Sequence, residues 1–101
     1  FIIANIFHII YIITLMEINS LIKNLEDKLK KNFIINNLKI EDKSFLHKKH
    51  KNFSKDKFHI MLTIESLELK KISSLEANRK IYTVLKEEMN GSIHSLQITI
   101  V

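Results

Sequence analysis

The sequence contains no cysteine, no proline and no tryptophan, and it has a single glycine among 101 residues. Without cysteine the chain cannot form a disulfide framework, a thiolate zinc site, a Cys-x-x-Cys redox pair or an iron–sulfur cluster held by its own thiolates. Chemistry with soft metals would therefore need thiolates from a partner. No P-loop or dinucleotide-binding fingerprint is present either.

Length and charge narrow the class of protein further. A chain of 101 residues with 46% hydrophobic residues predicts one small domain, without room for a large enclosed substrate cavity. The adjacent carboxylates Glu87 and Glu88 point about 100° apart on a helix, so they form no catalytic pair, and we expect both on its outer face. We therefore predict that the protein is not an enzyme.

The net charge of +5 permits nucleic acid or an acidic protein surface as a partner.

The first 16 residues carry no formal charge, and the first charged residue is Glu17. This run is shorter than the roughly 20 apolar residues that a membrane-spanning helix needs, and polar residues interrupt it, so we expect no stable span. It also lacks the basic start of a secretory signal and the Arg and Ser richness of a mitochondrial presequence. Residues 1–15 are therefore the remnant of a leader or anchor, an extension outside the native protein, or a core element. The domain itself is expected at 16–101.

Hydrophobic spacing predicts the elements of this domain. A helix is expected from Ile18, with Asn19 or Ser20 as its cap, because apolar residues recur at helical spacing through Leu29. Alternation predicts strands at 36–42 and 58–65. The segment 43–57 between them has six lysines and no consistent period, which is typical of a solvated loop.

The rest of the chain predicts a short helical turn at 67–71, a second long helix and a third strand at 93–101. Ser73 or Ser74 with Glu76 forms a possible capping box at the start of that helix. Gly91 stands where a left-handed cap is expected at its end. The inward stripe expected for this helix comprises Leu75, Ile81, Tyr82, Leu85 and Met89.

This order predicts an α+β two-layer sandwich with a three-stranded sheet and helices on one face. The first two strands are expected to pair as a hairpin across the lysine-rich loop. The third strand has to reach a sheet edge after the helical crossover, which is right-handed if the pairing is parallel.

Three segments resemble the BolA-like family. Residues 75–98, LEANRKIYTVLKEEMNGSIHSLQI, are similar to its helix motif, which opens with Arg-His-Arg, and to the following turn and Val/Ile-His-Ala-Leu strand. Residues 40–47, IEDKSFLH, resemble Val-x-Asp/Asn-x-Ser-x-x-His, and residues 58–66, FHIMLTIES, resemble a Ser/Thr-His-Phe strand. Of the Arg-His-Arg motif only Arg79 is kept. The resemblance covers residues 16–101 in the correct order.

The resemblance implies an αββααβ fold close to the class II KH topology. It also implies an adaptor that shares a [2Fe-2S] cluster with a monothiol glutaredoxin and its glutathione, for cluster assembly or trafficking. Carried over by position, the ligands are His94 on the last strand and His47 in the loop, with His50 as the fallback. Arg79 belongs to the basic face expected to dock the glutaredoxin. The chain would be a monomer alone and a heterodimer with this partner.

A second hypothesis is a nucleic-acid-binding transcriptional regulator that uses the KH-like fold and the basic loop. Some members of the family are described as regulators, and the loop's lysines, with Phe45 and Phe53, could contact phosphates and bases. A KH domain grips the backbone through a GXXG loop, which a chain with one glycine cannot have. The resemblance allows mitochondrial matrix, cytosol or nucleus, and the apolar start favours an organelle without deciding it.

Overall fold

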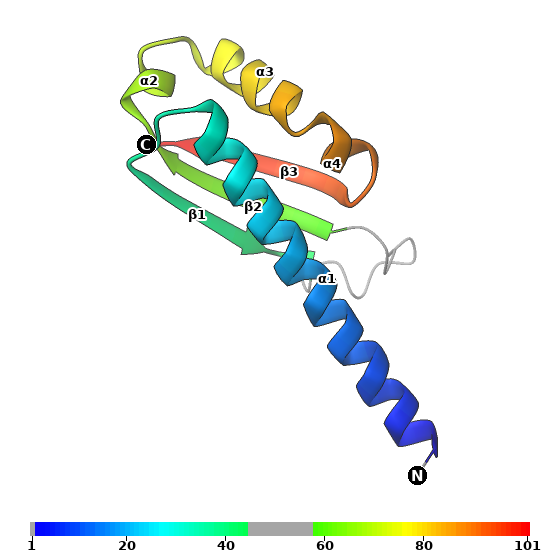
Figure 1. Cartoon of the computed structure of the whole chain (residues 1–101). Coiled ribbons are helices and arrows are strands. Elements are labelled where there is room, and N and C mark those ends of the chain that lie inside the picture. The colour runs from blue at the N-terminus through cyan, green and yellow to red at the C-terminus, as the bar shows by residue number, and fades with distance from the viewer. Residues whose placement is uncertain (1, 45–57) are drawn as a thin grey trace.

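The computed structural model describes residues 2–44 and 58–101. It contains the expected order of helices and strands, which Figure 1 shows along the chain. The elements are α1 (Ile2–Asn32), β1 (Asn37–Asp42), β2 (Phe58–Glu65), α2 (Leu67–Lys70), α3 (Ser74–Val84), α4 (Lys86–Asn90) and β3 (Ile93–Ile100).

The three strands form one sheet in the order β1-β2-β3. β1 and β2 pair antiparallel across the 43–57 connection, as the sequence predicts. β2 and β3 pair in parallel, so the helices α2, α3 and α4 form the crossover between them. The register is interrupted once, where Phe58 pairs with Ile93 but His59 pairs with Ser95. His94 is therefore the extra residue of a β-bulge.

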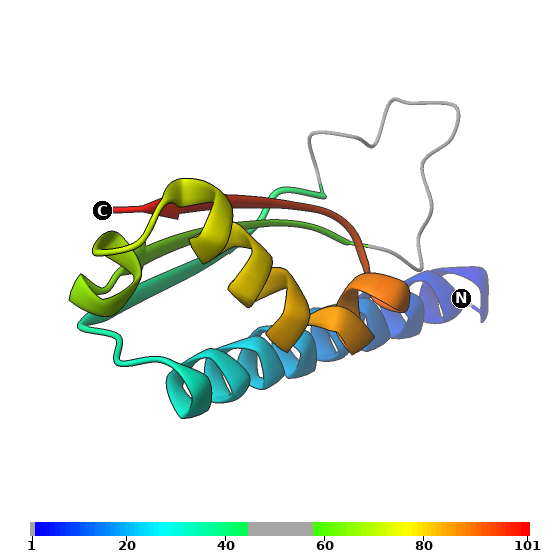
Figure 2. The ribbon, with the colours of Figure 1, turned by 90° about the horizontal axis from the view of Figure 1, so that it is seen from above.

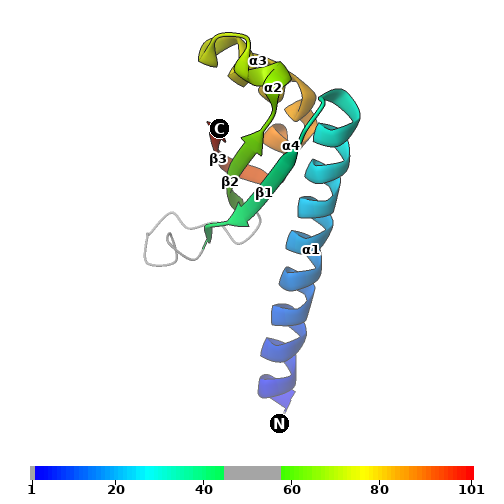
Figure 3. The ribbon, with the colours of Figure 1, turned by 90° about the vertical axis from the view of Figure 1, so that its left-hand side faces the viewer.

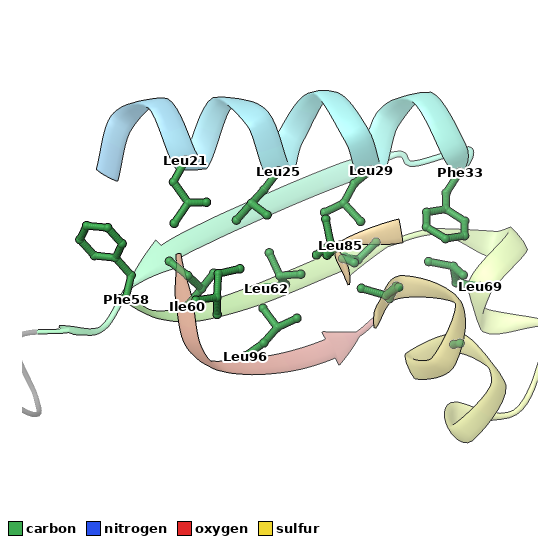
Figure 4. Close-up of a cluster of buried hydrophobic side chains, with 14 of the residues drawn as sticks. Leu21, Leu25, Leu29, Phe33, Phe58, Ile60, Leu62, Leu69, Leu85 and Leu96 are labelled. Atoms are coloured by element: carbon green, nitrogen blue, oxygen red, sulfur yellow. The ribbon is translucent and has the colours of Figure 1, made fainter. Parts of the chain in front are cut away.

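The helices lie on one face of the sheet, as Figures 2 and 3 show from two directions. Along β2 the side chains alternate strictly, and Ile60, Leu62 and Ile64 face the helices in the core. Figure 4 shows that α1 contributes a matching row of apolar side chains, among them the fully buried Leu25 and Leu29. Burying each such side chain stabilises the fold by about 1.5–3 kcal/mol.

Helix α1 begins at Ile2, much earlier than the sequence predicts. Asn19 and Ser20 consequently lie inside the helix and not at its start, because neither proline nor glycine interrupts the preceding run. The helix is exposed from Asn5 to Glu17, and Ile18 is its first buried residue among those described. Asn5–Asn32 is long and apolar enough to cross a membrane, a property shared by core helices of soluble proteins and by N-terminal signals.

The second long helix is divided in two. The backbone of Leu85, at φ −99° and ψ 19°, separates α3 from α4. The buried stripe follows an i, i+4 spacing through Ala77, Ile81 and Leu85. This corrects the expected stripe: Leu75 is 60% exposed, and Tyr82 is 40% exposed and donates a hydrogen bond to the Leu96 carbonyl at 3.1 Å.

The ends of these helices confirm one prediction and correct another. The Ser73 hydroxyl accepts a hydrogen bond from the Glu76 N–H at 3.1 Å, as the first half of a capping box does. Gly91 follows α4 as expected, but its φ of −115° is not left-handed. Its N–H donates to the carbonyls of Glu87 and Glu88, so the helix ends without the conformation that favours glycine.

Candidate functional site

The face of the sheet turned away from the helices is polar. β1 contributes Lys39 and Glu41 to it, and the alternation that buries Ile60 and Leu62 puts their neighbours on this face. Its members from the other two strands are His59, Met61, Thr63, Ser95, Gln97 and Thr99. No helix in the described part of the chain covers this face (Figure 2). We call it the open face.

The bulge adds a second residue from β3 to the open face. In a regular strand one exposed residue separates two buried ones. Here two exposed residues, His94 and Ser95, lie between the buried Ile93 and Leu96. Bulges commonly occur next to functional sites because they redirect a side chain without moving the core. The result is that two consecutive side chains of β3 lie beside His59 on β2.

His59 and His94 are in direct contact. Their ring centroids are 4.9 Å apart with an interplanar angle of 61°, an edge-to-face arrangement. The His59 ring also meets Ser95, where Nδ1 lies 2.7 Å from Oγ in a hydrogen bond whose direction depends on the tautomer. His59 is therefore in contact with both residues that the bulge exposes.

The main chain of His59 is held by the end of β1. Its N–H donates to the Ser44 hydroxyl at 3.1 Å, and its carbonyl accepts from the Lys43 N–H at 2.7 Å. The Ser44 hydroxyl donates in turn to a carboxylate oxygen of Asp42. The Asp-x-Ser part of the segment 40–47 therefore has a structural role: it ties the start of β2 to the residues that follow β1.

Lysines compensate the negative charge at this end of the open face. Lys39 Nζ lies 2.7 Å from Glu41 Oε1, and Lys43 Nζ lies 3.2 Å from Oε2. Hydrogen bonds from Lys39 and Lys43 hold the pKa of Glu41 below its usual value. This carboxylate is thus engaged in ion pairs with two lysines.

The structure brings the predicted site residues together only in part. His94 is exposed beside His59, whereas His47 and His50 lie outside the described residues. Arg79 is exposed on α3, in the helical layer and so across the sheet from the open face. Within 2–44 and 58–101 no group of three or more His, Cys, Asp or Glu side chains could hold a metal ion.

His59 is one of four histidines in residues 16–101, and the sequence alone assigns it no role. Two signals were available. The alternation of β2 puts His59 on the open face, and His59 matches the His of the Ser/Thr-His-Phe motif that residues 58–66 resemble. Its contact with His94 depends on the register of a parallel pair and on a bulge, and spacing along the chain reveals neither.

A groove of about 830 Å³ lies on the helical side of the molecule, between α1 and the turn from α4 to β3. Its lining includes Ile13, Met16 and Phe58, together with the carboxylates of Glu87 and Glu88. It is open to solvent, and none of the histidines that the structure describes lines it. The groove therefore does not extend the site on the open face.

Comparison with known proteins gives concordant matches in sequence and in structure. A family model described as "BolA-like protein" matches residues 29–101. A Haemophilus influenzae protein named "DNA-binding transcriptional regulator BolA" is 36% identical over 74 residues, which cover 73% of this chain and 69% of the relative.

Two solved structures from Arabidopsis thaliana are also similar to this chain, the BolA domain of SufE1 and BolA1. Each has a TM-score of 0.66 and 28% identity, and each match covers 77% of this chain and 86% of the other. The predicted α+β fold is therefore confirmed by structures as well as by the order of its elements.

Proposed function

This chain belongs to the BolA-like protein family, and from that premise we propose that it is an adaptor that shares a [2Fe-2S] cluster with a monothiol glutaredoxin. The observation that carries the proposal is the exposed imidazole of His94, which a bulge turns onto the open face against His59. The role is in cluster assembly or trafficking and involves no catalysis by this chain.

The donor set fits this division of ligands. The chain has five histidines and no cysteine, so it can supply imidazoles but not thiolates. Iron–sulfur clusters with two histidine ligands on one iron are known, and imidazole ligation raises their reduction potential relative to thiolate ligation alone. His94 would be one such ligand, and His47, or His50 in its place, the other. The glutaredoxin and its glutathione would supply the thiolates.

Two features of the chain bear on how the partner is held. A ligating imidazole nitrogen has to be unprotonated, so we expect the shared cluster to be lost in acid. Arg79 is exposed and makes no ion pair with any residue of 2–44 or 58–101, which leaves its guanidinium available to an acidic partner surface. The chain would then be a monomer alone and a heterodimer in the complex.

The test is to mix the protein with a cluster-loaded monothiol glutaredoxin and to record visible absorption and circular dichroism. Wild-type protein should change both spectra, and His94→Ala should not. His8→Ala is the matched control, because His8 is exposed on α1 outside the domain core. Comparing His47→Ala with His50→Ala identifies the loop ligand. An unchanged spectrum with wild-type protein, or a full response from His94→Ala, contradicts the proposal.

A second candidate function is favoured by a specific observation. The Haemophilus influenzae relative is named as a DNA-binding transcriptional regulator. In this chain residues 45–57 contain five lysines and one aspartate, so most of the net charge of +5 lies in this segment. Non-specific DNA binding depends on such positive charge, and its affinity falls as the salt concentration rises.

Salt-dependent binding to labelled duplex DNA tests this candidate. If the segment binds phosphates, replacing its five lysines by glutamine should flatten the salt dependence by about 0.9 in log–log slope for each phosphate that is no longer neutralised. The control removes the same charge from the exposed residues of the crossover helices: Lys70, Lys71, Arg79, Lys80 and Lys86. Failure to bind near physiological ionic strength, or equal effects of both sets, argues against this function.

A further inference from the structure

We propose that His59 is a positioning residue for His94, held in place from both neighbouring strands so that the exposed His94 imidazole is fixed for ligation. The inference rests on the proposed function, since it concerns how His94 is presented to the cluster. The bulge, the ring contact with His94, the bond from the His59 N–H to Ser44 and the bond between its ring and Ser95 carry it.

The first step is that His94 needs support. It lies on the edge strand β3, on a face that no helix of the described part covers, and its side chain is exposed. A side chain in such a place loses conformational freedom when it binds, unless a neighbour already restricts it. The edge-to-face contact with His59, at 4.9 Å between centroids, supplies this restriction.

The second step is that His59 is itself fixed. The central strand β2 carries it, and its N–H is bonded to Ser44 of the segment after β1. Its ring is bonded to Ser95 on β3, directly opposite in the register. His59 is also only half-exposed, because it lies between the two neighbouring strands. Because both the backbone N–H and the ring Nδ1 of His59 are hydrogen-bonded, the ring has a fixed position against which His94 packs.

The third step concerns the bulge. It brings Ser95 opposite His59 while leaving His94 beside the same ring, so one residue of β2 meets two of β3. A regular register would place only one β3 side chain at this level of the open face. Because of the bulge, the Ser95 side chain holds the His59 ring by a hydrogen bond, and the His59 ring in turn restricts the His94 side chain.

The size of the effect follows from comparable sites. Groups that orient a metal ligand without touching the metal typically contribute 10–100-fold to metal affinity. We therefore expect His59→Ala to weaken retention of the shared cluster by about tenfold or more. His59→Phe keeps a ring against His94 but loses the bond to Ser95, so it should restore only part of the retention. Ser95→Ala removes the bond to the His59 ring and should have an intermediate effect.

The experiment measures cluster retention in the complex with glutaredoxin for these three variants, with Gln97→Ala as control. Gln97 is exposed on the same strand and face but lies two residues beyond Ser95. We expect retention to be highest in wild type and Gln97→Ala, intermediate in His59→Phe and Ser95→Ala, and lowest in His59→Ala. Equal retention in His59→Ala and Gln97→Ala overturns the inference, and so does loss in His59→Phe as severe as in His59→Ala.

A second measurement needs no cluster. Nitrogen-15 NMR of the histidine rings in the free protein should show that His59→Ala shifts the ring signals of His94 and increases ring motion, whereas Gln97→Ala does neither. Unchanged His94 signals in His59→Ala overturn the inference. If His94→Ala loses the cluster and His59→Ala keeps it, positioning fails and the proposed function stands. If His94→Ala keeps the cluster, the proposed function fails and the ring signals alone decide positioning.

Discussion

Glu88 is a charged side chain that the fold buries, at 6% exposure, where α4 packs against α1. Its carboxylate accepts hydrogen bonds from Lys28 Nζ at 2.7 and 3.0 Å and from Asn24 Nδ2 at 2.7 Å. Burial raises its pKa, but the bonds from Lys28 and Asn24 outweigh burial, so the pKa lies below the usual 4.5. The expectation that both carboxylates are on the outer face was therefore wrong for Glu88.

The reason for that error is physical. Spacing assigns a charged residue to the solvent side, since a buried charge without a partner is costly. Here the partner Lys28 is 60 residues away along the chain, on another helix. Glu87 behaves as expected: its side chain is 89% exposed and lies 3.3 Å from the same lysine. Adjacent residues on α4 point in different directions, and although both reach Lys28, only Glu88 is buried against α1.

At the scale of single residues we predict that Glu88→Gln lowers the free energy of unfolding at pH 7 by about 1–3 kcal/mol, because it removes a charged acceptor for Lys28. Glu87→Gln should cost less than about 0.5 kcal/mol, as expected for an exposed pair. Urea unfolding of both variants and wild type checks this. An equal effect of the two substitutions would show that burial of Glu88 adds nothing.

The same pair predicts a pH dependence. The folded-state pKa of Glu88 lies below its unfolded value, so its stabilisation is fully present above the usual pKa of 4.5 and is lost as pH falls through the folded pKa. Glu88→Gln cannot titrate at this position. The stability difference between wild type and Glu88→Gln should therefore be constant near neutrality and shrink below pH 4.5, and a difference that grows in acid would contradict the assignment.

At the scale of elements, alternation predicted the strands well and left the ends of the helices uncertain. β2 was predicted at its observed bounds and β1 within one residue, because each buries one face. The start of α1 and the division at Leu85 were missed, since no breaker residue marks either place. Of the predicted ligands His94, His47 and His50, only His94 lies in the described part of the chain. Its contact with His59 depends on pairing between strands that are separated by the whole crossover.

Two serine caps allow a prediction about the short elements. The exposed Ser73 hydroxyl accepts one bond, from Glu76 N–H. The buried Ser66 hydroxyl accepts from Leu69 N–H at 3.3 Å and also donates to the Ile34 carbonyl at 2.7 Å, which ties α2 to the segment between α1 and β1. Ser73→Ala should cost about 1 kcal/mol.

Ser66→Ala should cost more, about 2 kcal/mol, since it also leaves the Ile34 carbonyl without its hydroxyl donor. Thermal or urea unfolding of the two variants gives the comparison. Equal losses would mean that the Ser66–Ile34 bond contributes nothing beyond capping.

At the scale of the whole molecule the shape is elongated, with principal extents of 56 × 26 × 21 Å. The first half of α1 accounts for this, because it projects beyond the sheet (Figure 1) and its side chains from Asn5 to Glu17 are exposed. The buried core on α1 starts at Ile18 and continues through Leu29 to Phe33. Residues 5–15 thus contribute little to the packing that holds the domain together.

We therefore predict that a chain beginning at Met16 folds and keeps its free energy of unfolding within about 0.5 kcal/mol of the full chain. Leu25→Ala, which empties a fully buried position on the same helix, should by contrast cost about 2–5 kcal/mol. Urea unfolding of both proteins distinguishes the interpretations of this segment. A loss comparable to that of Leu25→Ala would identify residues 1–15 as a core element of the fold.

The bulge in β3 also determines which deletions the strand can tolerate. Removing Ser95 would bring His94 opposite His59 and leave Phe58 paired with Ile93 and Ile60 with Leu96, in unbroken alternation. Every core residue would keep its place. The packed interior does not require the extra residue, so a chain without Ser95 should remain folded but lose the hydrogen bond to the His59 ring. A strand one residue shorter at Ser95 would therefore meet the needs of the fold but not those of the site.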